Sequence, residues 1–419
     1  MFSVYKNAWK IPELKKKILY TLLLLFIYRL GCAIPVAGIN TAVMTEMVDQ
    51  YSILGYLNMF SGGLANFTIF AMGITPYINA SIIMNLLSIA IPALERMAKE
   101  GEDGQKKIAK ITRYLTIALA FVQSIGIVMG LGNTVFMDGN PTIWNYIVIG
   151  LTVTAGTMFA MWLGERITEK GVGNGISLLI FVSIVSRLPQ SVLDLGDNVL
   201  SGVIGAWVIP AAIVFLLVVV VGVVYVDTGE RRIPVQYAKR VVGRKMYGGQ
   251  SSHIPVKVNS SGVLPIIFAS TLLSLPSMIA QFWPNSGFST FWETNLGAGT
   301  WPYMLIYALL IVFFTYFYTS VSFNPVEISK NIQQQGGFIP GIRPGKPTSD
   351  YLGRISRRLT LFGALFLAVL ATIPSLITGF MQMGAFAPTS VMIAVSVALE
   401  TSKQLESQML MRHYKGFLK

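Results

Sequence analysis

Long apolar stretches recur from one end of the chain to the other, and short polar segments separate them. A helix needs about 20 mainly apolar residues to cross the hydrocarbon core of a bilayer. Most of the apolar stretches approach or reach that length, and the fifth and tenth are the shortest and most polar. We therefore predict ten membrane-spanning helices, at residues 18–36, 67–92, 114–132, 143–163, 175–188, 204–226, 262–282, 303–323, 359–378 and 389–402.

The composition is typical of a protein whose solvent is the bilayer. Hydrophobic residues make up 53% of the 419 positions, charged residues only 12%, and the mean hydropathy is +0.61. Soluble proteins carry about 25% charged residues, so these values exclude an ordinary soluble protein. The basic N-terminal segment leads into the first span without a small-residue cleavage site, and we expect that span to be retained.

Lysine and arginine fall almost entirely on alternate loops. Of the 32 such residues, 30 lie at the two termini or in the loops that follow even-numbered spans. The other two, Arg29 and Arg187, lie inside the first span and at the end of the fifth. Because loops that stay in the cytoplasm are enriched in positive charge, this alternation predicts an even number of spans with both termini in the cytoplasm.

Ten spans divide into two sets of five, and because five is odd, the second set crosses the membrane inverted relative to the first. The predicted fold class is an all-α, polytopic membrane protein with ten transmembrane helices in two inverted, pseudosymmetric five-helix halves. The assigned parts are an N-terminal half at 1–188, a hinge connection at 189–203, a C-terminal half at 204–402 with basic cytoplasmic loops at 227–260 and 324–358, and a cytoplasmic tail at 403–419.

The segment 58–67, before the second span, has an unusual composition. It is too apolar for a solvated loop, and it is too short and glycine-rich to cross the membrane. Irregular backbone at membrane depth is tolerated only where protein surrounds it or where it lines a cavity. We interpret this segment as re-entrant. A helix lying on the membrane surface is the alternative that the residues leave open.

The spans offer few groups for ion coupling or catalysis. Apart from Arg29, their interiors hold no ionisable side chain, and such side chains mark proton relays and substrate pathways in transporters. Arg29 itself fits a structural pairing inside the bundle better than a substrate role. The sequence therefore argues against a secondary solute transporter, and also against an intramembrane protease, which needs Ser/His or paired aspartates in its spans.

Metal and cofactor sites have no candidate ligands. Cys32 is the only cysteine, and His253 and His413 lie far apart in polar segments. The run from Gly341 to Lys346 lacks the spacing and the Ser or Thr of a phosphate-binding loop. We predict no metal, no cofactor, no catalytic residues and no enzymatic activity.

The second span combines polar residues with isoleucines at helical spacing. Its many polar side chains either bond neighbouring helices together or line a wet path. Ile74 and Ile78 share one face of this helix, and Ile176 and Ile180 do the same in the fifth span. Opposed isoleucines can form a constriction that closes by excluding water, although such pairs more commonly pack a core.

Five long motifs follow one another over essentially the whole chain. They are GITPYINASIIM at 73–84, GERITEKGVGNGIS at 164–177, RRIPVQYAKR at 231–240, KVNSSG at 257–262 and GFIPGIRPG at 337–345. In content and order they resemble the SecY family, the channel subunits of the bacterial protein-export machinery. The resemblance implies a channel that opens across the membrane for secreted chains and sideways for membrane segments.

The resemblance also implies roles for particular residues. An aliphatic pore ring at mid-membrane matches Ile74, Ile78, Ile176, Ile180, Leu264, Ile267 and Ile393. A plug that closes the resting pore from outside matches Ser61, Gly62, Gly63, Leu64, Ala65, Asn66 and Phe67. The second and seventh spans would form a lateral gate, at which Asn79 and Asn85 meet signal sequences.

The basic loops gain a second interpretation from the same family. Retention in the cytoplasm is the simpler function of their charge. The family implies a docking surface for the SecA motor ATPase or for the ribosome, whose RNA attracts basic residues; it comprises Arg231, Arg232, Lys239, Arg240, Arg244, Lys245 and Arg343. Further implied partners are SecE and SecG, signal peptides, translocating polypeptides and anionic lipids, in the bacterial plasma membrane.

The sequence departs from the family pattern directly before its last span. Residues 384–390 read Gly-Ala-Phe-Ala-Pro-Thr-Ser, where the family usually has a Gly-Gly-Thr-Ser turn. The register of the tenth helix, and with it the assignment of Ile393, depends on this turn.

Overall fold

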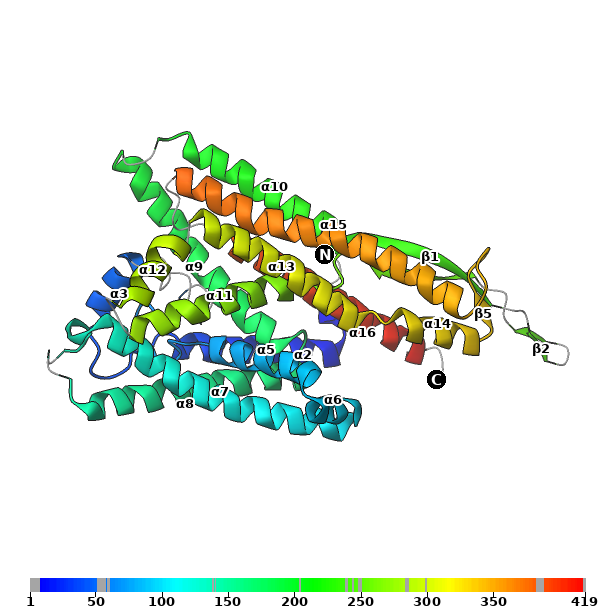
Figure 1. Ribbon diagram of the computed structural model, residues 1–419, viewed down its shortest axis with the longest axis horizontal. Coiled ribbons are helices and arrows are strands. Elements are labelled where there is room, and N and C mark those ends of the chain that lie inside the picture. The colour runs from blue at the N-terminus through cyan, green and yellow to red at the C-terminus, as the bar shows by residue number, and fades with distance from the viewer. Residues whose placement is uncertain are drawn as a thin grey trace.

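The computed structural model describes residues 8–50, 58, 61–137, 139, 141–202, 205–237, 240–242, 245–247, 251–282, 286–297, 300–381 and 388–416. It is an elongated bundle of long helices (Figure 1). Each of the ten predicted spans overlaps one helix of the described chain. These helices are α2 (Pro12–Gly31), α5 (Thr75–Ala90), α7 (Glu102–Leu131), α8 (Ile143–Lys170), α9 (Gly175–Leu200), α10 (Val208–Thr228), α11 (Leu264–Phe282), α13 (Trp301–Ser322), α15 (Lys346–Met381) and α16 (Pro388–Gly416).

Length and hydropathy support a membrane-spanning bundle. Among the described residues, six helices are long and apolar enough to cross a membrane. A seventh span results if α5 is counted together with α6 (Pro92–Lys99), although the two are bent by 101° at their junction. The all-α, polytopic fold is therefore confirmed.

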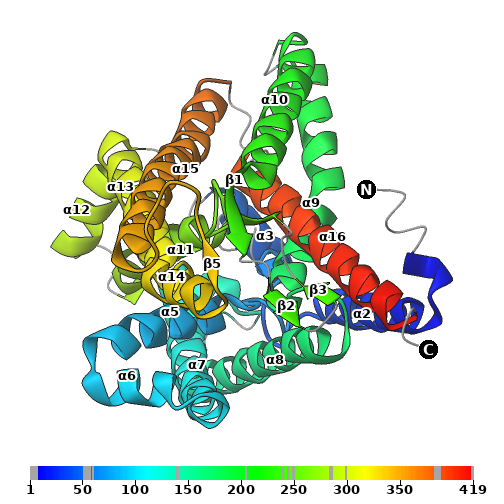
Figure 2. The same ribbon diagram turned by 90° about the vertical axis from the view of Figure 1, so that its right-hand side faces the viewer.

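The ten helices pack in two sets that follow the chain order. α2, α5, α7, α8 and α9 pack among themselves, and so do α10, α11, α13, α15 and α16. The sets meet where α11 packs against α5 and α7, and where α16 packs against α9. Seen end-on, α5, α7 and α8 lie along one side of the bundle and α10, α13 and α15 along another (Figure 2).

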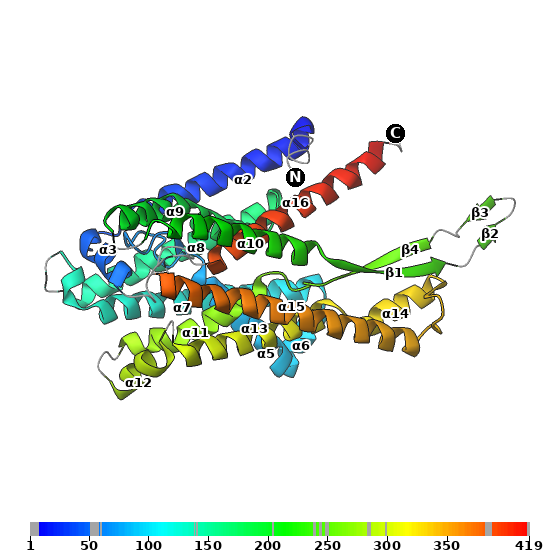
Figure 3. The same ribbon diagram turned by 90° about the horizontal axis from the view of Figure 1, so that it is seen from above.

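Shorter elements gather at the two ends of the bundle. α3 (Thr41–Gln50), η1 (Asn133–Val135) and α12 (Gly287–Leu296) lie at one end. α6 and α14 (Pro325–Gln334) lie toward the other end, to which the start of α2 and the end of α16 also point (Figure 3).

A small sheet projects from this second end (Figures 1 and 3). β1 (Glu230–Tyr237) is the central strand and pairs antiparallel with β4 (Ser251–Lys257) on one side and β5 (Gly337–Phe338) on the other. β2 (Arg240–Val242) and β3 (Lys245–Tyr247) form a separate antiparallel pair.

The sheet has its own small core. On β1, Ile233 and Val235 are buried, and they cluster with Ile332 of α14 and Leu352 of α15. The predicted loops 227–260 and 324–358 are therefore largely folded. The alternation of polar and apolar residues along β1 is the period-2 signal that could have predicted a strand.

Several helix ends differ from the predicted boundaries; for example, α15 begins at Lys346 instead of residue 359, and α16 runs to Gly416 and so includes most of the predicted tail. The second span was expected at 67–92, but the backbone is irregular from Gly62 to Ile74, and α5 is only 16 residues long. Pro76 lies in the first turn of α5, where its missing N–H costs no helical hydrogen bond. The fifth span was expected to end at residue 188, but α9 runs to Leu200 with Pro189 inside it. Most of the predicted 189–203 connection is helical, and its role as a hinge stays a prediction.

Candidate functional site

Six of the seven predicted ring residues lie in or against one hydrophobic cluster at the centre of the bundle. Ile176 is partly buried against this cluster. Five others belong to it and are at most 6% exposed: Ile74, Ile78, Ile180, Ile267 and Ile393. Leu264 is the exception, because it is 41% exposed and lines a polar pocket. The six come from α9, α11, α16 and the start of α5, so both five-helix sets contribute to the cluster.

The turn between α8 and α9 positions the ring residues of α9. The side-chain oxygen of Asn174 caps α9 by accepting hydrogen bonds from two backbone N–H groups of its first turn, at 3.1 and 3.3 Å. A Cβ atom at Gly175 would lie 1.9 Å from the carbonyl oxygen of Gly164. Glycine is therefore required for α8 and α9 to approach as closely as they do. The GERITEKGVGNGIS motif thus fixes the register of Ile176 and Ile180.

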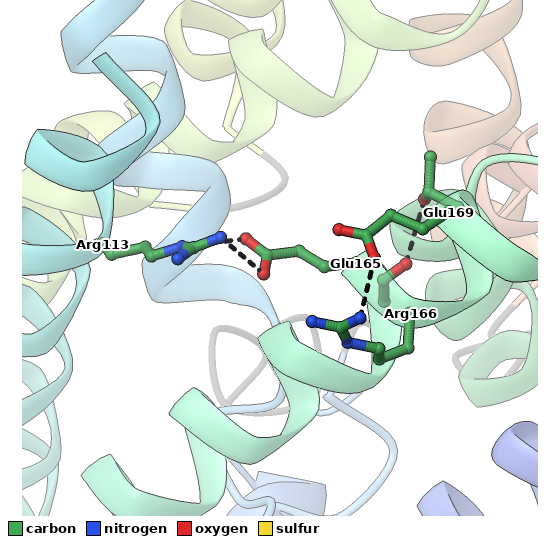
Figure 4. A network of polar contacts seen from close by, with 6 residues as sticks. Arg113, Glu165, Arg166 and Glu169 are labelled. Carbon is green, nitrogen blue, oxygen red and sulfur yellow. Dashed lines mark hydrogen bonds and ion pairs between the residues drawn. The ribbon is translucent and has the colours of Figure 1, made fainter. Parts of the chain in front are cut away.

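An ion-pair network joins α7 to α8 close to this turn (Figure 4). Arg113 of α7 donates to both carboxylate oxygens of Glu165 on α8, from Nε at 3.1 Å and from Nη2 at 2.9 Å. Arg166 pairs with Glu169 at 2.9 Å. Because bidentate pairs fix orientation as well as distance, the first of these holds α7 at a defined angle to α8.

The predicted plug is described from Ser61 onward, while Met59 and Phe60 of the 58–67 segment lie outside the described residues. From Gly62 to Ile74 the backbone forms turns and bends. Leu64 and Phe67 are each 1% exposed, whereas Asn66 is exposed. The described residues of the segment therefore form buried, irregular backbone.

One carbonyl group ties this segment to two helices. The backbone oxygen of Ser61 accepts hydrogen bonds from the hydroxyl of Tyr28 on α2 at 2.9 Å and from that of Ser183 on α9 at 3.4 Å. The two hydroxyl oxygens lie 3.1 Å apart, and all three residues are buried. Leaving such a buried carbonyl unpaired costs about 1–3 kcal/mol, so the cluster holds the segment in place.

Close packing holds the rest of the segment. A Cβ atom at Gly156 of α8 would lie 1.8 Å from the carbonyl oxygen of Ile69, and one at Gly73 would lie 2.7 Å from the Cα of Ser61. Gly73 also has φ +52°, a left-handed conformation that favours glycine. Helix α8 and the segment therefore touch backbone to backbone.

The two helices of the predicted lateral gate are in contact, because α11 packs against α5. Asn79 is 1% exposed, and neither atom of its side-chain amide has a hydrogen-bond partner among the described residues. Asn85 is exposed and donates from Nδ2 to the hydroxyl of Tyr318 on α13 at 3.4 Å. The ring of Tyr318 lies 4.9 Å from that of Phe268 on α11. These contacts link α5 to two helices of the other set.

Those predicted docking residues that the structure describes lie around the projecting sheet. Arg231 and Arg232 are exposed on β1, and Arg343 is exposed between β5 and α15. Arg240 and Lys245 belong to β2 and β3, with their side chains not described. Lys239 and Arg244 lie outside the described residues.

A pocket of about 410 Å³, lined by polar residues and by Val263, Leu264 and Leu399, lies beside the hydrophobic cluster that contains the predicted ring residues. Its walls come from the start of α9, the end of α10, the segment before α11, and α16. Leu264 lines it together with Asn174 and Ser177 of α9. Both helix sets therefore contribute to the pocket.

The comparisons with known proteins agree with one another. The SecY family model matches residues 68–402. Protein translocase subunit SecY of Corynebacterium glutamicum is 45% identical, with 100% of both chains covered, and that of Thermotoga maritima is 44% identical, with 100% of this chain and 98% of the relative covered. The chain belongs to the SecY family. The resemblance drawn from the five motifs is confirmed.

Solved structures show that the SecY fold covers nearly the whole chain. "The structure of a protein conducting channel" superposes with a TM-score of 0.68 at 21% identity, with 96% of both chains covered. "Sec61 in the Canine ribosome-channel complex from the endoplasmic reticulum" superposes with a TM-score of 0.64 at 19% identity, again with 96% of both chains covered.

Some residues of this SecY-family site escaped the sequence analysis. Tyr28, Ser183 and Asp227 were not singled out, because one polar residue among apolar neighbours gives no pattern until its distant partner is known. Arg29 was expected to pair within the bundle, and this stays a prediction: its Nη1 is buried without a hydrogen-bond partner among the described residues, while its guanidinium interacts with the side chain of Cys32. The described residues contain no group of three His, Cys, Asp or Glu side chains able to hold a metal.

Proposed function

We propose that the buried isoleucines of this chain form the constriction of a protein-conducting pore. The chain is the central, channel-forming subunit of a protein translocase, which moves unfolded secretory proteins across a membrane. One observation carries the constriction: isoleucines from four separate segments, in both five-helix sets, lie in or against a single buried cluster.

An aliphatic constriction suits a channel that must accept any sequence. When closed, it excludes water and ions because an apolar neck of molecular width dewets. When a chain passes, the apolar isoleucine side chains surround it without needing matched polar partners. A coupled solute transporter would instead place ionisable groups at this depth, and apart from Arg29 the interiors of the predicted spans contain no Asp, Glu, Lys or His.

The segment from Ser61 to Phe67 acts as the plug of this pore. Besides the bonds at the Ser61 carbonyl, it is held by the N–H of Val36, which donates to the oxygen of Phe67 at 2.9 Å, and by Asn58, whose Oδ1 accepts from two N–H groups of the segment at 3.0 and 3.1 Å. Each is worth about 1 kcal/mol, so a signal peptide binding elsewhere can shift the equilibrium toward release. Bonds of this individual size hold a buried segment in place and can be exchanged one by one when a plug is displaced.

The contact between α5 and α11 acts as the lateral gate through which membrane segments leave the pore. Asn79 has a buried amide without a hydrogen-bond partner among the described residues. A buried unsatisfied group costs about 1–3 kcal/mol, which destabilises the closed gate. A signal peptide or water that reaches Asn79 and Asn85 in the open state would pair with them and favour opening.

The arginines around the projecting sheet dock the cytoplasmic partner that supplies the chain. SecA or a ribosome would bind there, and SecE, SecG and anionic lipids would contact the outer surface of the bundle. The Sec61 neighbour comes from a ribosome-channel complex, which supports this role for the sheet end. The protein would lie in the bacterial plasma membrane with both termini in the cytoplasm.

Site-specific crosslinking tests the constriction. A photoreactive residue is placed at Ile78, Ile180 or Ile267 in the assembled complex, and a secretory chain is stalled during export. We expect crosslinks from all three positions, because each side chain would surround the passing chain. The matched control is Leu217 of α10, which is 56% exposed on the outer surface. If the chain is exported and none of the three positions gives a crosslink, the assignment of these residues to a pore ring is refuted.

A further inference from the structure

A carboxylate at the end of α10 connects the two C-terminal segments that carry ring residues. Oδ1 of Asp227 accepts a hydrogen bond from Nδ2 of Asn259 at 2.7 Å, and Oδ2 accepts one from Oγ of Ser396 at 2.5 Å. The backbone oxygen of Asp227 accepts a further bond from Nζ of Lys403 at 2.9 Å. One residue thus bonds to the segment before α11 and to two places on α16.

Asn259 passes this link on to the start of α11. Its Nδ2 also donates to the backbone oxygen of Gly262 at 3.2 Å, and its Oδ1 accepts from the hydroxyl of Ser261 at 3.3 Å. Gly262 has φ +61°, and α11 begins two residues later at Leu264. Because Asn259 is only 6% exposed, little water is available to replace a lost partner.

Ser396 passes the link to α16. It lies three residues after Ile393 on the same helix, and residues at this spacing share a face. Ser396 is 6% exposed and Ile393 is fully buried. The bond to Asp227 therefore fixes the rotation of α16 about its own axis at the level of Ile393.

The cluster lies beside the pore rather than in a remote part of the bundle. Asp227, Asn259 and Ser396 line the pocket of about 410 Å³ that also contains Leu264 and, from the other helix set, Asn174. A change in the carboxylate therefore alters a pocket whose walls come from both helix sets.

We propose that Asp227 is a positioning residue of the pore ring: its carboxylate holds α16 and the start of α11 in the register that closes the constriction. This inference rests on the ring assignment above. The chemistry requires an acceptor on both oxygens, since Asn259 and Ser396 both donate. Ionised aspartate accepts at both oxygens without donating, whereas asparagine offers one acceptor and alanine none.

The test compares Asp227→Asn and Asp227→Ala in the assembled complex. Two quantities are measured: ion leak through the resting channel in lipid vesicles, and the rate at which a water-soluble maleimide labels Ile393→Cys in a Cys32→Ser background. Losing one charge-assisted bond shifts an equilibrium by about tenfold. We expect both quantities to rise by up to about a hundredfold in Asp227→Ala, which removes both carboxylate bonds, and by about tenfold in Asp227→Asn, which keeps one acceptor.

Two further variants separate positioning from a general loss of stability. Ser396→Ala should raise the labelling rate, and adding it to Asp227→Ala should have little extra effect because both remove the same bond. Glu400→Ala is the matched control, since Glu400 lines the same pocket outside the cluster, and it should change neither quantity.

The outcomes are distinguishable. Unchanged leak and labelling in a folded Asp227→Ala complex would overturn the inference. A lowered melting temperature with an unchanged labelling rate would also overturn it, because Asp227 would then stabilise the fold without positioning the ring. If Asp227→Ala does not assemble, Asp227→Asn decides by the same two measurements. Absence of crosslinks at the ring positions of the parent protein would refute the ring itself, independently of Asp227.

Discussion

The buried segment from Gly62 to Ile74 and the projecting sheet of β1, β4 and β5 satisfy their backbone groups in opposite ways. The sheet pairs its own strands, so its N–H and C=O groups need no help from side chains. The segment has little regular structure, and its groups bond to distant parts of the chain such as Ile34 and Val36, while Tyr28 and Ser183 donate to the carbonyl of Ser61 directly before it.

Because of this difference, we expect substitutions in the two regions to have different effects. Irregular backbone inside a bundle is held by close packing and a few side-chain donors, so small changes in its neighbours displace it. A self-paired sheet leaves its outward side chains free, so its surface arginines can change without loss of structure. We therefore expect substitutions around the segment to alter stability and closure, and those on the sheet surface to alter docking alone.

The largest expected effect on stability comes from Gly156→Ala. The new Cβ would lie 1.8 Å from the carbonyl oxygen of Ile69, so the buried segment or α8 must shift. Such overpacking should lower the free energy of unfolding by about 3 kcal/mol and raise the ion leak of the resting channel. Thermal unfolding of the purified complex and vesicle leak measure the two effects.

Gly222→Ala is the matched control, because it makes the same change in α10, where the nearest atom is a ring carbon of Phe366 at 3.6 Å. It should leave the leak unchanged and stabilise the helix by up to about 1 kcal/mol. Equal effects of the two substitutions would contradict the close contact between α8 and the segment.

A smaller effect is expected from Tyr28→Phe, which removes the donor at 2.9 Å from the Ser61 carbonyl. Ser183 remains as a weaker partner at 3.4 Å, so the loss should be about 1 kcal/mol. A cysteine placed at Leu64 in a Cys32→Ser background should then react with a water-soluble maleimide about five times faster.

Tyr225→Phe removes the same hydroxyl from a side chain that is 78% exposed and should leave the labelling rate unchanged. If Tyr28→Phe also leaves the rate unchanged, then the Ser61 cluster does not hold the segment closed.

The smallest effect on stability is expected from Arg343→Glu near the sheet. An exposed substitution should change the free energy of unfolding by less than about 0.5 kcal/mol. Motor-driven export should nevertheless fail, since the reversed charge repels an acidic partner, and the affinity for SecA should fall and depend less on salt. Arg96→Glu on α6 is the matched control, because it makes the same charge change at an exposed position outside the predicted docking surface. Unimpaired export by Arg343→Glu, or equal loss in Arg96→Glu, would refute the docking surface.

The sequence predicted more about the bundle than about the connections within it. Each predicted span overlaps a helix, because a run of apolar residues can satisfy its backbone in a bilayer only as a helix. Hydropathy could not locate the start of α5, since the residues from Phe67 to Ile74 are as apolar as the helix after them. It also missed β1, because hydropathy measures burial and the strand has one exposed face.

The predicted ring was a set of positions on separate helices, and packing decided which of them share one environment. Leu264 differs from the others because α11 begins at that residue, beside a polar pocket. The roles of Tyr28, Ser183 and Asp227 had no sequence signal, since the partners of Tyr28 and Asp227 include residues 155 and 169 positions away.

Sequence alone determined the number of apolar segments, the alternation of basic loops and the motifs of the SecY family, because these properties depend on residue type and local spacing. Tertiary structure alone decided that the segment after Ser61 is buried without regular structure, and that one carboxylate joins the end of α10 to α16 and to the segment before α11. The reason is that hydrogen bonds and close contacts between distant segments exist only once the helices have packed.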